Sequence, residues 1–119
     1  LLNEIEGWRC LGRYAKTGRN AYHLQISAYN PGSFSGLPKK KFLAALLAEG
    51  VVATDGYRPV YSMPFIEDSE PLPHTEAACR DQVWIRQFEL LADRHLMDKT
   101  AEAIRKIQDH SRLLCAQDI

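Results

Sequence analysis

A ten-residue segment, Gly56–Phe65, holds the densest group of side chains that could bind a ligand. Its sequence, GYRPVYSMPF, combines three aromatic rings, one arginine and two prolines. A guanidinium and phenolic hydroxyls offer hydrogen bonds to a carboxylate or a polar ring, and prolines reduce the entropy lost when side chains are held ready for a ligand. The same rings could instead fill the domain core or a protein interface, and the sequence leaves both interpretations open.

Other chemical motifs are incomplete. His74 with Cys79 and His110 with Cys115 are each five residues apart, without the short Cys-x-x-Cys spacing of zinc sites. Phe34 stands where a nucleophile elbow needs its serine, and the sequence holds neither phosphate-binding string, GxxxxGKS/T or GxGxxG. We therefore expect no metal ligand, no nucleophile elbow and no nucleotide-phosphate loop in this chain.

Three consecutive lysines, Lys39–Lys41, stand at the start of a predicted helix, where the helix dipole disfavours cations. A polar partner would explain them. Such a run is more commonly a solvated helix face, and both interpretations remain open.

The elements that would position these residues follow from periodicity. Alternating or β-branched runs predict strands, and apolar residues at helical spacing predict helices. The strands are expected over residues 22–29, 51–54 and 82–85, and the helices over 38–49, 75–80 and from the N-cap Asp93 onward. Residues 56–73 are expected to form a long loop, and Glu102 and Lys106 have the spacing of an ion pair on the last helix. This order predicts an α+β fold, a small mainly antiparallel sheet covered on one side by helices.

The composition fits one domain over residues 1–119, because 45% of the residues are hydrophobic and 25% are charged. The longest apolar run, Phe42–Ala48, is far shorter than the roughly 20 residues of a membrane-spanning helix. The three cysteines form no close pair, so a cytoplasmic location is expected. Leu1–Ile5 resembles the last turn of a helix that began earlier, so we expect the chain to be a fragment.

The formal charge of zero hides a split along the chain. Residues 1–48 hold seven basic and two acidic side chains, and the remainder is acidic by the same margin. A basic half could contact phosphates, but neither an aromatic-basic RNA-binding signature nor a Cys/His finger accompanies it. We expect no nucleic-acid partner.

Four segments in this order resemble the carboxy-terminal domain of the DegT/StrS family of pyridoxal-phosphate (PLP) aminotransferases. They are FLAALLAEGV at 42–51, GYRPVY at 56–61, LPHTEAACR at 72–80, and VWI at 83–85 with AIRKI at 103–107. The likeness covers most of residues 20–110 and favours the branch of 3-amino-5-hydroxybenzoate synthase and the inosose aminotransferases. Tyr61 stands where most nucleotide-sugar members have a histidine, and Arg86, Gln87 and Phe88 replace the usual Leu-Pro-His pattern, so no function is carried onto those three.

The resemblance implies the small domain of a fold-type I enzyme that moves an amino group from glutamate or glutamine to a keto sugar, a ketocyclitol or a related ring. PLP, the catalytic lysine and the carboxylate that holds the cofactor would belong to the large amino-terminal domain, which is absent here, so this chain alone is expected to be inactive and without cofactor. A fragment would expose apolar surface meant for the missing domain or a partner subunit, so we also expect a homo-oligomer, such as a dimer. The resemblance gives Tyr57, Arg58 and Tyr61 as substrate-binding contacts at the active-site mouth. The alternative is a free-standing, non-catalytic domain that binds a polyol or dimerises.

Overall fold

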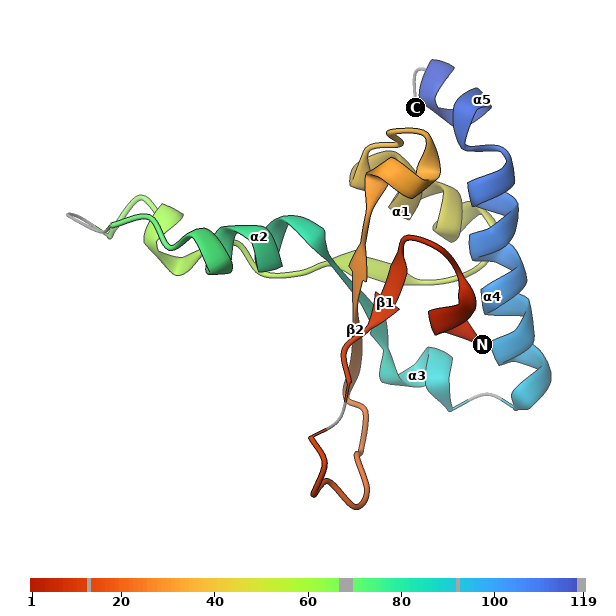
Figure 1. Ribbon diagram of the computed structural model, residues 1–119, viewed down its shortest axis with the longest axis horizontal. Helices are drawn as coiled ribbons and strands as arrows, with labels where there is room; N and C mark the ends of the chain where they lie inside the picture. Colours follow the sequence, from red (N-terminus) through yellow and green to blue (C-terminus); the bar gives the residue numbers. More distant parts are fainter. Residues whose placement is uncertain (13, 67–69, 92, 118–119) are drawn as a thin grey trace.

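The computed structural model describes residues 1–12, 14–66, 70–91 and 93–117, and these residues build a four-stranded antiparallel sheet (Figure 1). The strands are Trp8–Cys10 (β1), Leu24–Tyr29 (β2), Ala53–Asp55 (β3) and Gln82–Arg86 (β4). They lie in the order β1-β2-β4-β3. The central pair joins Leu24 to Arg86 and Ala28 to Gln82, so residues far apart in the sequence meet in the middle of the sheet.

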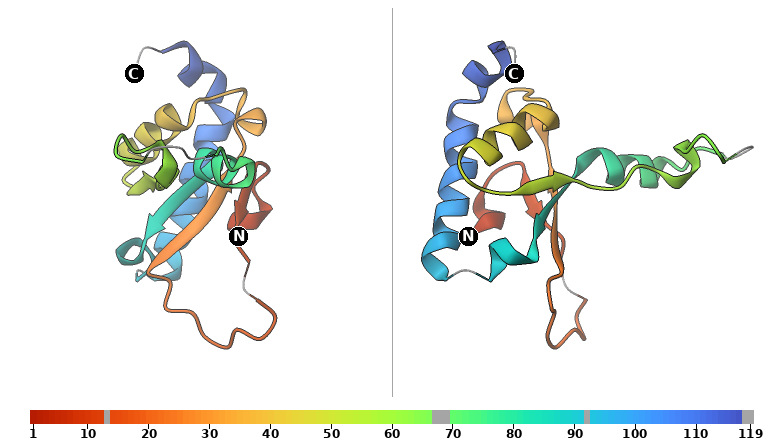
Figure 2. Two further views of the ribbon diagram at one scale, coloured as in Figure 1. Left: turned by 90° about the vertical axis from the view of Figure 1, so that its left-hand side faces the viewer. Right: turned by 180° about the vertical axis from the view of Figure 1, so that it is seen from behind.

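Helices α1 (Lys39–Ala48) and α4 (Arg94–Asp109) cover one face of this sheet (Figure 2). Their buried side chains pack with those of the strands and of the 3-10 turn η2 (Pro31–Phe34). The Tyr29 and Phe42 rings stack at 4.4 Å between centroids, and Phe34 meets the Phe42 ring edge-on. The remaining helical elements are η1 (Leu2–Glu4), η3 (Val60–Ser62), α2 (Pro73–Asp81), α3 (Gln87–Leu90) and α5 (Ser111–Ala116).

Alternation along β2 decides which side chains enter the core. Ser27 and Tyr29 are buried against the helices, and both are satisfied: Tyr29 Oη donates to the Leu37 carbonyl at 2.7 Å, and Ser27 Oγ lies 3.6 Å from Cys10 Sγ. The apolar side of the predicted alternation therefore faces away from α1 and α4. We call that side the open face; its half-buried apolar side chains are Leu24, Ile26, Ala28 and Trp84.

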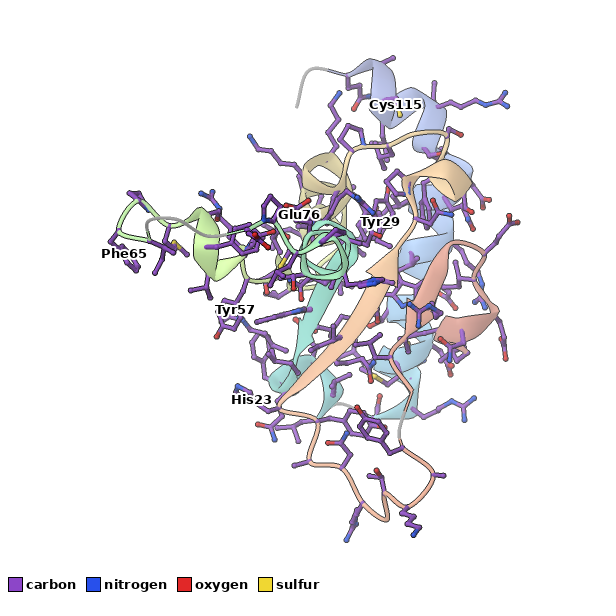
Figure 3. All side chains as sticks on the ribbon, turned by 60° about the vertical axis from the view of Figure 1, so that its left-hand side comes forward. His23, Tyr29, Tyr57, Phe65, Glu76 and Cys115 are labelled. Atoms are coloured by element: carbon purple, nitrogen blue, oxygen red, sulfur yellow. The ribbon has the colours of Figure 1, made fainter. Side chains whose placement is uncertain are left out.

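Two segments of the described chain project from this body. One, called the arm, comprises residues 56–66 and 70–81 with η3 and α2, and it rises from the open face (Figures 1 and 2). Phe65 lies near its tip and Tyr57 at its base (Figure 3). The other is the segment between β1 and β2. The radius of gyration is 15.6 Å, against about 13.5 Å for a compact domain of this length, because these segments extend beyond the core.

The predicted elements are present with shifted ends. The strand predicted at 51–54 begins two residues later and ends one residue later, as β3. The helix predicted at 75–80 extends back to Pro73, whose fixed φ suits a first helical turn. The predicted loop 56–73 contains η3 and the start of α2, and its residues 67–69 lie outside the described residues.

The predicted ion pair on α4 is wrong. Lys106 Nζ bonds Glu49 at the end of α1 at 2.7 Å, and Glu102 pairs instead with Lys99 at 2.7 Å. Lys106 ties α4 to a neighbouring helix, a long-range contact that spacing along one helix could not indicate.

Candidate functional site

A cavity of about 520 Å³ opens at the base of the arm. Tyr57 and Arg58 line it from the arm, Lys39 from the start of α1, and Glu76 and Arg80 from α2. The structure thus brings two of the residues predicted to contact substrate together with charged side chains from two helices.

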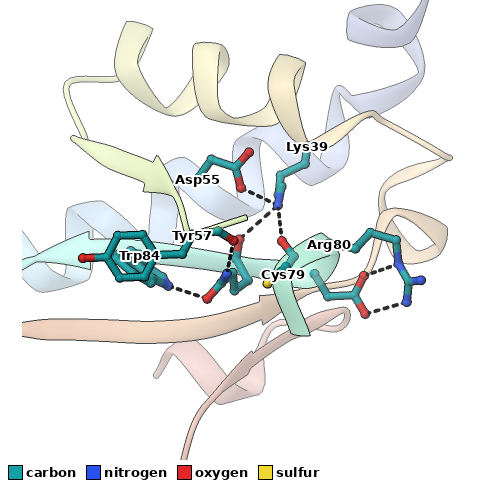
Figure 4. A network of polar contacts seen from close by, with 8 residues as sticks. Lys39, Asp55, Tyr57, Cys79, Arg80 and Trp84 are labelled. Carbon is teal, nitrogen blue, oxygen red and sulfur yellow. Dashed lines mark hydrogen bonds and ion pairs between the residues drawn. The ribbon is translucent and has the colours of Figure 1, made fainter. Parts of the chain in front are cut away.

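A chain of contacts fixes Tyr57 at this cavity (Figure 4). Gln82 Nε2 donates to the Tyr57 carbonyl at 3.0 Å, and Trp84 Nε1 donates to Gln82 Oε1 at 2.8 Å. The Tyr57 ring meets the Trp84 ring edge-on at 4.7 Å, a favoured aromatic geometry. A Cβ at Gly56 would lie 2.1 Å from the Gln82 side chain, so a larger residue there would displace Gln82 from its present position.

Lys39 joins the arm to the body of the domain. Its Nζ donates to the carbonyls of Cys79 and Gln82 at 3.2 and 3.3 Å, at the carboxyl end of α2, and pairs with Asp55 of β3. The last carbonyls of a helix lack partners within it and lie at the negative end of its dipole, so an ammonium group suits them. The lysine side chain is only 16% exposed.

Lys41 caps a second helix end in the same way. Its Nζ donates to the carbonyls of Leu114, Cys115 and Gln117 at the end of α5. Lys40, between the two, is exposed. Lys39 and Lys41 therefore have polar partners at the ends of other helices, whereas Lys40 lies on a solvated face.

The charges around the cavity are mostly paired. Lys39 pairs with Asp55, and Arg80 forms two bonds with Asp81, at 2.8 and 3.1 Å, that raise the pKa of Arg80. Arg58 is exposed and has no hydrogen-bond or ion-pair partner among the described residues. It is thus the cation at this cavity whose donors remain open to an anionic ligand.

Tyr61, the third predicted contact, lies elsewhere on the arm. Its hydroxyl donates to Glu76 Oε1 at 2.8 Å and accepts from the backbone N–H of Leu72 at 3.3 Å. Desolvation, with the bond to Glu76, raises the pKa of Tyr61. Tyr61 does not line the cavity with Tyr57 and Arg58, and it instead ties η3 to the start of α2.

Neither a metal-ligand cluster nor a membrane-spanning helix is found among the described residues. Within residues 1–12, 14–66, 70–91 and 93–117, no cluster of three histidine, cysteine or acidic side chains could hold a metal. In those same ranges, no helix is both long and apolar enough to cross a membrane. His110 Nδ1 lies 2.8 Å from the Lys106 carbonyl, and Cys115 Sγ lies 3.6 Å from that of Ser35, so both have local structural partners.

Sequence reasoning did not identify four residues that shape the site: Lys39 as a link, Asp55, Gln82 and Trp84. The signal for Lys39 was its unfavourable place at a helix start. Asp55 is on β3, whereas Gln82 and Trp84 are on β4, so Asp55 meets the other two only through the pairing of β3 with β4.

No protein-family model matches the chain, and no curated protein matches it. Solved structures do. The crystal structure of 3-amino-5-hydroxybenzoic acid (AHBA) synthase matches 92% of this chain with a TM-score of 0.76 at 22% sequence identity. An aminotransferase, TlmJ from Streptoalloteichus hindustanus, matches 91% with a TM-score of 0.72 at 15% identity. These likenesses establish a shared α+β fold.

The match covers only part of each neighbour. This chain spans 31% of the synthase chain and 28% of the TlmJ chain, so nearly all of it corresponds to less than a third of either protein.

Proposed function

We propose that this chain serves as the carboxy-terminal small domain of a PLP-dependent aminotransferase of the DegT/StrS type. The parent would move an amino group from glutamate or glutamine to a keto sugar, a ketocyclitol or a related ring. The observation that carries the proposal is the fold shared over 92% of the chain with less than a third of a larger synthase. The four ordered sequence segments support the same family independently of the fold.

PLP, when bound to such an enzyme, is the electron sink for the carbon that loses or gains the amino group. This chain's described lysines do not fit it, because a lysine that attacks a carbonyl must present a free, neutral amine. Four of the six lysines have an amine engaged with carbonyls or carboxylates: Lys39, Lys41, Lys99 and Lys106. The other two, Lys16 and Lys40, are exposed and do not line the cavity at the base of the arm. We therefore assign no catalytic or cofactor-binding residue to this chain, and place both functions on a large amino-terminal domain.

The role left to this chain is to shape the substrate side of the active site. The guanidinium of Arg58 can form a two-pronged contact with a carboxylate or another anionic group, and Tyr57, fixed by Gln82 and Trp84, presents a ring beside it. Tyr61 completes the proposed set by holding the arm in shape through Glu76.

The exposed apolar side chains of the arm support a protein partner. Their exposed fractions range from 38% to 77%, and they are Tyr57, Val60, Phe65, Ile66 and Leu72. Apolar groups gathered on one projecting segment mark a contact surface. We propose that the arm packs against the large domain or a second subunit of a cytoplasmic homo-oligomer.

The test is substitution of Tyr57, Arg58 and Tyr61 by alanine, singly and together, in the full-length enzyme. Loss of charge-assisted hydrogen bonds at Arg58 predicts a fall in kcat/KM of roughly 10- to 100-fold. Arg112→Ala on α5 is the matched control, because Arg112 is exposed and does not line this cavity. An unchanged kcat/KM in the triple variant would remove the proposed substrate contacts.

The alternative, a non-catalytic dimerisation or polyol-binding domain, rests on the same exposed arm. It predicts that the 119-residue chain forms a stable dimer or binds a cyclitol by itself. The small-domain proposal predicts neither PLP attachment nor transamination by this chain alone.

A further inference from the structure

A second cavity, of about 650 Å³, opens on the open face of the sheet. Tyr57 and Asp55 line both this cavity and the one at the base of the arm. The wall of the second cavity is completed by β4 and α3, with Trp84, Arg86 and Phe88. Nothing in the function proposed above uses it.

Its apolar wall is aromatic and held in place. Trp84 has its indole N–H committed to Gln82, so the surface that it offers a ligand is its ring. Gln82 is held in turn by the Tyr57 carbonyl, and the Tyr57 ring packs edge-on against Trp84. Phe88, 54% exposed, adds a third ring. A flat ligand would meet rings whose orientation is set before binding.

Its polar wall is cationic. Arg86 is two residues from Trp84 on the same strand, so the two side chains share the open face. Arg86 has no hydrogen-bond or ion-pair partner among the described residues. His23 also lines the cavity, while the charge of Asp55 is already met by Lys39. An open guanidinium next to aromatic rings suits an anionic group attached to a flat ring.

We propose that this cavity binds an aromatic ring that carries an anionic substituent, with the ring against Trp84 and the carboxylate or phosphate on Arg86. The proposal rests on residues of this chain alone and does not depend on the proposed aminotransferase role.

The experiment is a fluorescence titration of the 119-residue protein with benzoate and with phenyl phosphate. The protein contains two tryptophans, and Trp8 is buried in the core at 2% exposure, so a ligand in this cavity should change the emission of Trp84 alone. A saturable change with a Kd of roughly 1 mM is expected for so small a ligand. Tighter binding of benzoate or of phenyl phosphate identifies the anion as a carboxylate or a phosphate.

Variants separate anion recognition from apolar adsorption. Arg86→Gln should weaken the binding of benzoate at least about fivefold, and Arg86→Lys should keep part of the lost affinity. Neutral benzyl alcohol should bind the unsubstituted protein as weakly as benzoate binds Arg86→Gln. Arg9→Gln, from an exposed arginine on β1 that does not line this cavity, should leave the Kd unchanged. No saturation up to roughly ten times the expected Kd, or equal binding by Arg86→Gln with its far-UV circular dichroism intact, overturns the proposal.

Discussion

Replacing Lys39 by methionine should destabilise the domain and loosen the arm, because it removes a half-buried cation from two helix-end carbonyls. Methionine keeps an unbranched side chain but cannot donate to Cys79 or Gln82. Two long charge-assisted hydrogen bonds contribute about 1 kcal/mol each, and the pair with Asp55, which is 63% exposed, adds about 0.5 kcal/mol. The expected loss in unfolding free energy is thus about 2–3 kcal/mol.

Urea denaturation followed by far-UV circular dichroism would measure this loss as a fall in midpoint of roughly 1–2 M. Lys40→Met is the matched control, since Lys40 is the exposed neighbour, and it should cost less than about 0.5 kcal/mol. Asp55→Asn should cost less than Lys39→Met, because the carbonyls keep their ammonium partner. If Lys39→Met and Lys40→Met were equally stable, the link between α1 and α2 would contribute nothing and the reasoning would be refuted.

Three further outcomes are expected. Burial, with a smaller effect of Cys115, raises the pKa of Tyr29 above its unfolded value near 10. The contribution of Tyr29 to the unfolding free energy is therefore full below pH 10 and falls as the pH rises above it. In urea titrations at alkaline pH, Tyr29→Phe should flatten that decline by up to about 1.4 kcal/mol per pH unit, and equal slopes would contradict the assignment. Tyr61→Phe cannot donate a hydrogen bond to Glu76, so it should raise the rate of proteolysis within the arm several-fold while amide exchange in the core stays unchanged. An unaltered cleavage rate would show that this hydrogen bond does not hold the arm. Phe65→Ser should reduce the concentration-dependent self-association that sedimentation velocity measures, because the Phe65 ring is 76% exposed near the arm tip. Association equal to that of the unsubstituted chain would exclude the arm tip from the contact between chains.

The sequence indicated the fold where local chemistry agrees with tertiary packing. Helix α1 follows Pro38 and is closed by Gly50, whose φ of +85° favours glycine, and α4 begins at Asp93, whose side chain accepts from the Leu96 N–H. Strand β1 gave no usable signal, because three residues are too short for alternation to be recognised and the strand forms by pairing Trp8 with Tyr29.

The site was less accessible to sequence reasoning. GYRPVY drew attention to Tyr57 and Arg58, and the structure places them at one cavity. The hydroxyl of Tyr61 is already bonded to Glu76, a contact that spacing could not reveal. Lys39 and Gln82 are 43 positions apart and meet only in the folded chain.

The most direct test of the central claim is the size and cofactor content of the native polypeptide that carries this sequence. Antibody capture from the native source followed by mass spectrometry and PLP analysis would supply both. We expect a polypeptide about three times as long, by analogy with the synthase of which this chain spans 31%. PLP should be bound outside residues 1–119, and glutamate or glutamine should convert it to its amino form. A native polypeptide of 13.5 kDa, free of PLP and of any PLP-binding partner, would contradict it.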